Sequence, residues 1–313
     1  MQLLSHTPGF DVDSAIQMAE RLFGLRATAR LLPSERDQNF LLTDERGERF
    51  VLKIANALES RELLEAQNAV LDHLRERVSF CPRVVPNVSG EMISREGGHQ
   101  HYVRLATYLP GTPLALATPH SPELLQDFGR KLGRLDRALA DFDRPVLHRD
   151  FHWDLANGNR VIDQHAGLIS DSRLRALIHK CRFEMNTDLR RSVIHGDAND
   201  YNVLVEEDRV VGIIDFGDMV YSWTIGDLAV ALAYVVLGKD EPRVMAEHVV
   251  DGYTGEFALL QEEREVLWKL VRLRLGMSVC LAAHQQTLRP DNEYLRISQQ
   301  AIADTLPRLY EHG

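Results

Sequence analysis

The chain has 313 residues, of which 44% are hydrophobic and 26% charged, with a formal net charge of −10 at pH 7. This composition is typical of a globular protein with a sizeable core, and the acidic balance argues against nucleic-acid binding, which needs clustered basic residues. The three cysteines are far apart and form no C-x-x-C pair, so neither a disulfide framework nor a zinc site is indicated.

The N-terminus has no basic region followed by an apolar stretch, which is the pattern of a signal peptide. The longest apolar run, residues 228–237, is much shorter than the ~18 residues that a membrane-spanning helix needs. We therefore expect a cytoplasmic protein that contacts neither membrane nor nucleic acid.

The N-terminal third predicts a sheet with two helices beside it. Residues 11–24 carry apolar side chains at helical spacing behind two aspartates, which predicts a short amphipathic helix. A second helical stripe covers residues 58–77. Apolar runs between turn residues predict five strands, and their short hairpin connections favour antiparallel pairing. These strands are expected at residues 27–33, 38–43, 48–55, 83–88 and 101–109.

The Pro-Gly-Thr-Pro stretch at residues 110–113 ends this β-rich pattern, and the chain beyond it reads as mostly helical. The sequence therefore predicts an α+β fold of two lobes. The smaller lobe, with the antiparallel sheet, would cover residues 1–108, and the larger, mostly helical lobe would cover residues 109–313. Helices of this second lobe are expected near residues 121–141 and 170–186, from 226 onward, and three times between 241 and 310.

Residues 193–218 carry the clearest chemical signal in the chain. His195-Gly196-Asp197 follows a short apolar run, and Asn202 comes five residues after Asp197. Two β-type runs then lead to Asp215-Phe216-Gly217-Asp218. A base aspartate, an asparagine and an aspartate in Asp-Phe-Gly form the pattern of phosphoryl transfer. Each piece alone is common, but the joint pattern, with 18 positions from Asp197 to Asp215, is rare by chance.

This pattern predicts a role for three side chains. Mg²⁺ prefers hard oxygen ligands and normally takes one or two from the protein. Asn202 and Asp215, at the two ends of one hairpin, would supply them, and Asp197 would face the acceptor hydroxyl as the catalytic base. Only 12 positions separate Asp215 from Asp227, where a buried apolar helix begins, so the activation loop of a protein kinase has no room. The expected acceptor is therefore a small molecule.

A second stretch, His148-Arg149-Asp150, is a literal H-R-D motif. Leu155 stands five residues after Asp150, where the pattern requires asparagine, and no aspartate follows on a strand hairpin. We therefore reject Asp150 as the base. His148 and His152 are four residues apart, but no third residue is spaced to complete a metal site.

The motifs H-G-D-x-x-x-x-N and I-D-F-x-D resemble those of the aminoglycoside phosphotransferase/choline kinase family, whose members are small-molecule kinases with a protein-kinase-like fold. Four further stretches resemble the hydroxylysine-kinase branch, including the kinase-type domains that some bacteria fuse to class III aminotransferases. These stretches are L-P-S-E-R-D-Q-N-F at 32–40, F-V-L-K-I-A at 50–55, E-A-Q-N at 65–68 and H-W-D-L-A-N at 152–157. The resemblance covers nearly the whole chain.

The resemblance implies that the small lobe binds ATP or GTP. Lys53 lies on the third predicted strand, where kinases place the lysine that holds the nucleotide phosphates, although a surface lysine is the alternative. The E-A-Q-N stretch points to Glu65 as the carboxylate that orients Lys53. Two other glutamates of the same predicted helix, Glu59 and Glu62, are alternatives.

The glycine-rich loop of protein kinases is missing from this chain. Ser34 and Asn39 are candidates for phosphate contacts in its place, with a plain hairpin turn as the alternative. Adenine would pair with backbone groups near Thr107, Tyr108 and Leu109.

Four residues of the larger lobe are candidates for binding the acceptor. Trp153 and Asp154 offer an aromatic face and a carboxylate to an ammonium group, although a loop-to-helix connector with a buried tryptophan is the alternative. Asp200 and Asp218 offer further carboxylates, and Asp218 is alternatively a ligand of a second metal ion.

The leading hypothesis is phosphorylation of a cationic amino alcohol such as 5-hydroxylysine, with Mg²⁺ and ATP or GTP. Homoserine, ethanolamine, choline and an aminoglycoside are alternative acceptors. A nucleotide-binding pseudokinase with a regulatory role is the alternative of another class, supported only by the missing glycine loop. The resemblance also allows for a longer polypeptide that carries a pyridoxal-phosphate enzyme domain.

Overall fold

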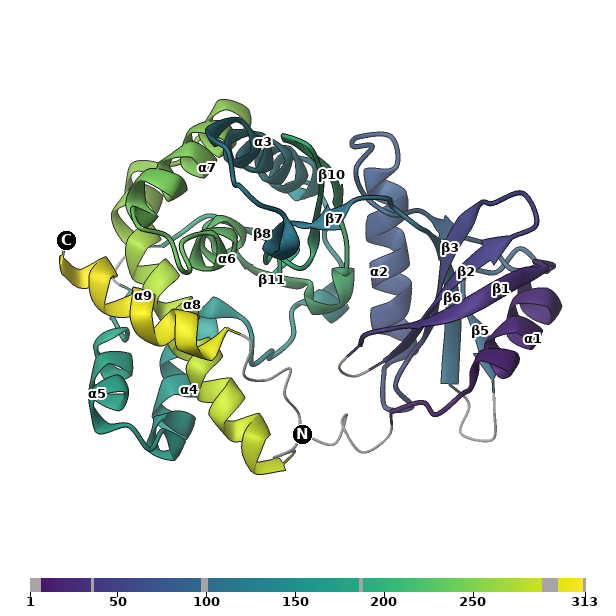
Figure 1. Ribbon diagram of the computed structural model, residues 1–313, viewed down its shortest axis with the longest axis horizontal. Coiled ribbons are helices and arrows are strands. Elements are labelled where there is room, and N and C mark those ends of the chain that lie inside the picture. Colours follow the sequence, from purple (N-terminus) through teal and green to yellow (C-terminus); the bar gives the residue numbers. More distant parts are fainter. Residues whose placement is uncertain (1–6, 35–36, 97–100, 186–187, 289–297, 312–313) are drawn as a thin grey trace. The chain divides into compact units, whose positions relative to one another are not determined.

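The computed structural model describes residues 7–34, 37–96, 101–185, 188–288 and 298–311 (Figure 1). Contacts within the chain divide it into two compact units, Met1–Pro110 and Gly111–Gly313. Among the described residues, no helix is long and apolar enough to cross a membrane.

The first unit is an antiparallel sheet with one helix on each face (Figure 1). All strand pairs are antiparallel, as predicted, but a short strand that was not predicted, β5 (Ser94–Glu96), pairs with β6 and makes the sheet six-stranded instead of five-stranded. The other strands follow the order β1 (Ala27–Leu32), β2 (Gln38–Asp44), β3 (Arg49–Ile54), β6 (His101–Thr107) and β4 (Val84–Val85).

Side chains alternate between the two faces of this sheet, and each face packs against its own helix. Buried apolar residues such as Leu42, Leu52 and Ile54 pack against α1 (Val12–Phe23), which the Asp11 side chain caps. On the opposite face, α2 (Arg61–Leu74) begins after Ser60, whose hydroxyl accepts a hydrogen bond from the Leu63 N–H. The polar residues of this second face therefore lie beside α2.

The second unit is mostly helical. Ser121 caps α3, with proline at its first position, and α6 is buried almost all round, as its apolar sequence predicts. Two small sheets lie in the unit, and strands β7 and β11 and helix α4 were not predicted. The helices are α3 (Pro122–Leu139), α4 (Gly158–His165), α5 (Ser172–Lys180), α6 (Ile225–Val235), α7 (Pro242–Glu256), α8 (Gln261–Leu288) and α9 (Gln299–Glu311). The strands are β7 (Thr112–Pro113), β8 (Arg191–Ile194), β9 (Val203–Glu206), β10 (Arg209–Ile213) and β11 (Val220–Trp223).

Helices α3 and α7 approach each other so closely that two glycines line their contact. A Cβ atom on Gly129 would lie 1.9 Å from the carbonyl oxygen of Val249, and one on Gly252 would lie 2.0 Å from that of Gln126. Both contacts involve backbone atoms, which cannot rotate away. Any larger residue would therefore push the helices apart.

Replacing Gly129 with alanine is expected to lower the free energy of unfolding by about 3 kcal/mol, because overpacking a rigid helix contact costs roughly that much. Gly255 on α7 is the matched control: a Cβ there has nothing within 4 Å, so Gly255→Ala should leave stability unchanged or slightly raised. Urea unfolding of the two variants measures the difference. Equal midpoints would show that the helix contact adjusts.

Candidate active site

Hydrogen bonds to the first turn of α6 anchor the His195-Gly196-Asp197 turn. The buried carboxylate of Asp227 accepts hydrogen bonds from the backbone N–H groups of His195 (2.8 Å) and Gly196 (2.6 Å). Gly196 has φ +78°, and a Cβ there would lie 2.8 Å from the carbonyl oxygen of Asp218. Glycine is therefore required at this position for both conformation and space.

The β9–β10 hairpin brings Asn202 and Asp215 to one end of the sheet. The Ile214 N–H donates to the Asn202 carbonyl (2.9 Å), and the His195 imidazole Nε2 bonds the Ile214 carbonyl (3.0 Å). Asp215 has φ 63°, a left-handed conformation that costs energy for a non-glycine residue. The chain therefore leaves the extended β conformation at Asp215, two residues after the end of β10.

The structure brings the predicted base together with both predicted metal ligands. The Asn202 side-chain Nδ2 donates to the Asp197 carbonyl (2.9 Å) and to the Asp197 carboxylate Oδ2 (3.0 Å). Burial, together with the charges of Asp218 and Asp215, raises the pKa of Asp197 to about 7, against the lowering effect of Arg274. Asp215 and Asp218 therefore lie within electrostatic range of Asp197.

Arg274 on α8 completes this cluster, and the sequence patterns missed it because it lies in a predicted helix that carries no motif. Its guanidinium Nη2 donates to Asp197 Oδ1 (2.8 Å), and Nη1 donates to the Trp153 carbonyl (3.2 Å). The available signal was a charged residue within an apolar helical stripe, since buried charges are rare unless they are paired.

The surroundings of Trp153 and Asp154 favour the loop-to-helix connector among the earlier alternatives. The Arg274 guanidinium lies 4.4 Å from the centre of the Trp153 ring, so this ring already has an internal cationic partner. The Asp154 carboxylate is buried and accepts hydrogen bonds from the Ser222 hydroxyl (2.5 Å) and the Ala156 N–H (3.0 Å). Burial raises the pKa of Asp154.

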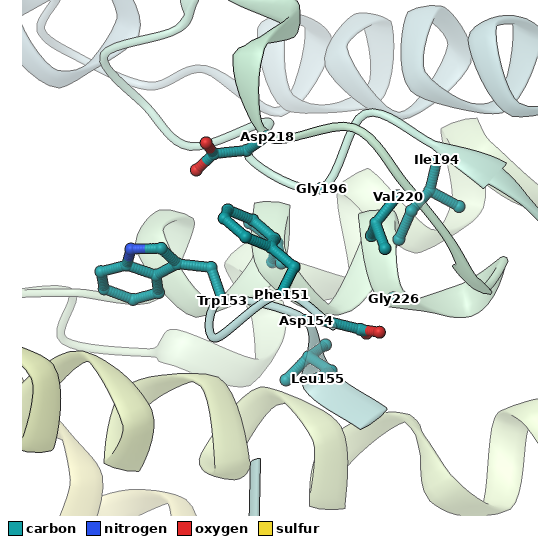
Figure 2. Close-up of a pocket in the computed structure, with 10 residues that line it drawn as sticks. Phe151, Trp153, Asp154, Leu155, Ile194, Gly196, Asp218, Val220 and Gly226 are labelled. Carbon is teal, nitrogen blue, oxygen red and sulfur yellow. The ribbon is translucent and has the colours of Figure 1, made fainter. Parts of the chain in front are cut away.

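Asp218 and Trp153 project to one side of a small cavity, whereas the Asp154 carboxylate points the other way (Figure 2). The cavity has a volume of about 10 Å³, enough for roughly one water molecule but not for an amino alcohol. Asp200 lies in the same loop as Asp197, and burial raises its pKa to about 6. Of the four predicted acceptor ligands, Asp218 and Asp200 therefore stay the better candidates.

The rejected H-R-D stretch has a supporting role that the patterns did not predict. Asp150 is exposed and forms an ion pair with Arg160. Arg149 donates hydrogen bonds to the carbonyls of Gly217 (3.1 Å) and Met219 (2.8 Å). Arg149 therefore braces the loop that follows Asp215.

In the first unit, Lys53 lies on the sheet face that packs against α2. Its cross-strand neighbours are Asn39 on β2 and Arg104 on β6, and Arg104 donates to the Asn68 side chain of α2 (3.1 Å). The Asn39 side-chain oxygen is buried and has no hydrogen-bond partner among the described residues. Two predicted phosphate contacts, Lys53 and Asn39, thus lie side by side.

The structure does not bring Ser34 and Glu65, the other predicted side-chain contacts of the nucleotide site, into a contact with Lys53 that can be described. Ser34 is exposed, two residues after the end of β1. Glu65 is exposed and forms an ion pair with Arg61 (2.7 Å) on its own helix, so its pairing with Lys53 stays a prediction.

Two backbone N–H groups of the predicted adenine-binding segment already form hydrogen bonds within the first unit. The Thr107 N–H donates to the Arg83 carbonyl (2.9 Å), and the Tyr108 N–H donates to the Arg49 carbonyl (3.1 Å). A bound base would therefore have to use the N–H of Leu109 or the carbonyl groups of this segment.

Asp136 on α3 is a neighbour of Asp227 and is fully buried. The Tyr253 hydroxyl donates to its Oδ2 (2.6 Å), while Oδ1 has no hydrogen-bond partner among the described residues. Burial, and then the charge of Asp227, raise the pKa of Asp136 well above its ordinary value. The carboxyl group is therefore protonated in the folded protein at pH values where it ionises in the unfolded chain.

This shift predicts that stability depends on pH. The unfolded chain ionises Asp136 at about pH 4. Below that pH the raised pKa of the folded state contributes its full stability. As the pH rises from there toward the pKa of the folded state, that stability is lost by up to about 1.4 kcal/mol per pH unit. Asp136→Asn removes the titrating group, so its unfolding free energy should fall less between about pH 5 and pH 8 than that of the parent protein. Asp251→Asn, at an exposed position of α7, is the control. Parallel curves for the parent and Asp136→Asn would contradict the assignment.

The chain resembles known proteins over most of its length. Residues 28–266 match the phosphotransferase enzyme family. The chain is 33% identical to hydroxylysine kinase of Danio rerio, over 99% of this chain and 92% of that one. Because the relative is covered almost from end to end, it lends no support to the longer polypeptide that the sequence resemblance allows for.

Solved structures with this fold include two small-molecule kinases. A microcompartment-associated aminopropanol kinase matches with a TM-score of 0.73 and 20% identity, over 96% of this chain and 97% of that one. An amicoumacin kinase in complex with AMP-PNP, Ca²⁺ and Ami matches with a TM-score of 0.71 and 16% identity, over 95% of this chain and 93% of that one. These likenesses confirm the predicted protein-kinase-like α+β fold.

Proposed function

We propose, because the chain belongs to the phosphotransferase enzyme family, that it transfers the terminal phosphoryl group of ATP or GTP to the hydroxyl of a small amino alcohol. The observation that carries the proposal is the cluster of Asp197, Asn202 and Asp215 at the end of one hairpin. Similarity to hydroxylysine kinase over nearly the whole chain makes 5-hydroxylysine the first acceptor to test.

The charges of the cluster support a divalent cation. Asp215 and Asp218 each interact electrostatically with Asp197, and Arg274 is paired with Asp197. Three carboxylates and one guanidinium leave two formal negative charges, which a divalent cation would balance. Asn202 and Asp215 would hold Mg²⁺ through oxygen atoms. When bound, the ion would neutralise charge on the phosphates.

The first unit would hold the nucleotide. Lys53 and its neighbour Asn39 would contact the phosphates, with Ser34 as a further candidate. Glu65 would orient Lys53 once it leaves Arg61, and Leu109 would contact the base. The structural relative solved with AMP-PNP supports a nucleotide ligand for this fold.

Asp197 would accept the proton of the acceptor hydroxyl and orient its oxygen for in-line attack. Arg274 and Asn202 each bond one oxygen of this carboxylate, and each oxygen keeps a further lone pair for the acceptor. Asp218 and Asp200 would receive the ammonium groups of the acceptor. Positioning and charge neutralisation would supply most of the rate.

The test is turnover with Mg-ATP and Mg-GTP against 5-hydroxylysine, homoserine, ethanolamine, choline and an aminoglycoside. We expect nucleoside-diphosphate release that depends on acceptor and metal, and a phosphorylated product by ³¹P NMR. Turnover on another alcohol with none on 5-hydroxylysine would overturn the proposed acceptor. Tight nucleotide binding without any acceptor-stimulated turnover would favour the pseudokinase.

A further inference from the structure

Arg274 is an almost completely buried cation at the candidate site. It lies in the middle of α8, and only 2% of its side chain is exposed. A buried ion pair is costly to desolvate and often adds no net stability, so a packing role alone explains it poorly. Its contacts point to the carboxylate of Asp197.

The two oxygens of the Asp197 carboxylate are held by different elements. Arg274 Nη2 donates to Oδ1 (2.8 Å) from α8, and Asn202 Nδ2 donates to Oδ2 (3.0 Å) from the start of the β9–β10 hairpin. The Asp197 side chain is 21% exposed, so it keeps an open side. Together the two donors fix the plane of the carboxylate and leave that open side for a ligand.

The guanidinium also contacts groups other than Asp197. Nη1 donates to the Trp153 carbonyl (3.2 Å), and the guanidinium carbon lies 4.4 Å from the Trp153 ring centre and 5.7 Å from that of Tyr234. A planar fork can bond the Asp197 carboxylate and the Trp153 carbonyl at once, whereas a lysine ammonium is a single point of charge. The arrangement therefore depends on arginine itself.

We propose that Arg274 is a positioning residue that fixes the orientation of the Asp197 carboxylate toward the acceptor hydroxyl. The inference rests on the proposed function. It makes α8, which is distant in sequence from every motif, a part of the catalytic machinery. Its loss should lower kcat, because a misplaced base slows the chemical step, while nucleotide binding stays intact.

Arg190 provides a matched control within the same unit. It donates two hydrogen bonds to the buried carboxylate of Glu263 on α8 (3.1 and 2.8 Å) and stacks on Phe257 at 4.1 Å. This pair has the chemistry of the Arg274 pair, but neither partner contacts Asp197. Arg190 is partly exposed, whereas Glu263 is buried, so Arg190→Gly reports the cost of removing the arginine partner of a buried carboxylate on α8.

The experiment compares Arg274→Gly, Arg274→Lys and Arg190→Gly with the parent protein, below the unfolding temperature of each. We expect Arg274→Gly to lower kcat by about 10²-fold with nucleotide KM changed less than about threefold. Added methylguanidinium should raise the kcat of Arg274→Gly about tenfold, because it can occupy the space that the arginine side chain left. It should not raise the kcat of the other variants. Arg190→Gly should lose stability without losing kcat.

Each outcome decides the inference. A folded Arg274→Gly with kcat near that of the parent, or a loss that methylguanidinium does not restore, overturns it. If Arg274→Gly does not fold, Arg274→Lys decides: about tenfold lower kcat supports the inference, and parental kcat overturns it. A parent protein that phosphorylates no acceptor contradicts the proposed function instead, which separates the two failures.

Discussion

Replacing Asp197 with alanine is expected to lower kcat for acceptor phosphorylation by about 10³-fold, within the range that a positioned general base contributes. The loss should appear in kcat more than in nucleotide KM, because Asp197 would act on the hydroxyl proton and not on the nucleotide. Steady-state turnover with saturating nucleotide measures it. Asp197→Asn keeps the shape of the side chain and tests the charge alone.

Asp150 is the matched control for this prediction. It stands in the literal H-R-D motif, but its exposed carboxylate is paired with Arg160. Asp150→Ala should therefore keep kcat within about twofold of the parent value. A large loss in Asp150→Ala with a small loss in Asp197→Ala would reverse the assignment of the base.

Replacing Asp215 with asparagine is expected to lower kcat/KM for the nucleotide by about 10³-fold and to raise the Mg²⁺ concentration needed for half-maximal rate. Asparagine also tolerates the left-handed backbone at this position, so the variant removes the charge without adding backbone strain. Titration of the rate with Mg²⁺ separates weaker metal binding from slower chemistry.

Glu206 is the control for the charge at Asp215. It is an exposed carboxylate at the far end of β9, in the same hairpin. Glu206→Gln should leave both the rate and the Mg²⁺ titration within about twofold of the parent values. An unchanged Mg²⁺ requirement in Asp215→Asn would contradict its proposed role as a metal ligand.

The sequence alone determined the features that depend on residues close together in the chain. Ser60 and Ser121 cap the helices that follow them, and the alternation of apolar residues set the faces of β2 and β3. Caps, alternation and hairpins are local, because each needs only contacts across a few residues. The cluster of Asp197, Asn202 and Asp215 could be predicted for the same reason, since one hairpin joins its parts.

Only the tertiary structure decided what surrounds that cluster. Arg274 is 77 positions from Asp197, and the two meet only because α8 packs beside the catalytic turn. Arg149 reaches the loop after Asp215 from 68 to 70 positions away. The sequence offers Asp154 as a substrate ligand. In the structure, however, its buried carboxylate accepts a hydrogen bond from Ser222, which lies 68 positions later in the chain. Such pairs leave no periodic pattern in the sequence, because the packing of distant elements creates them.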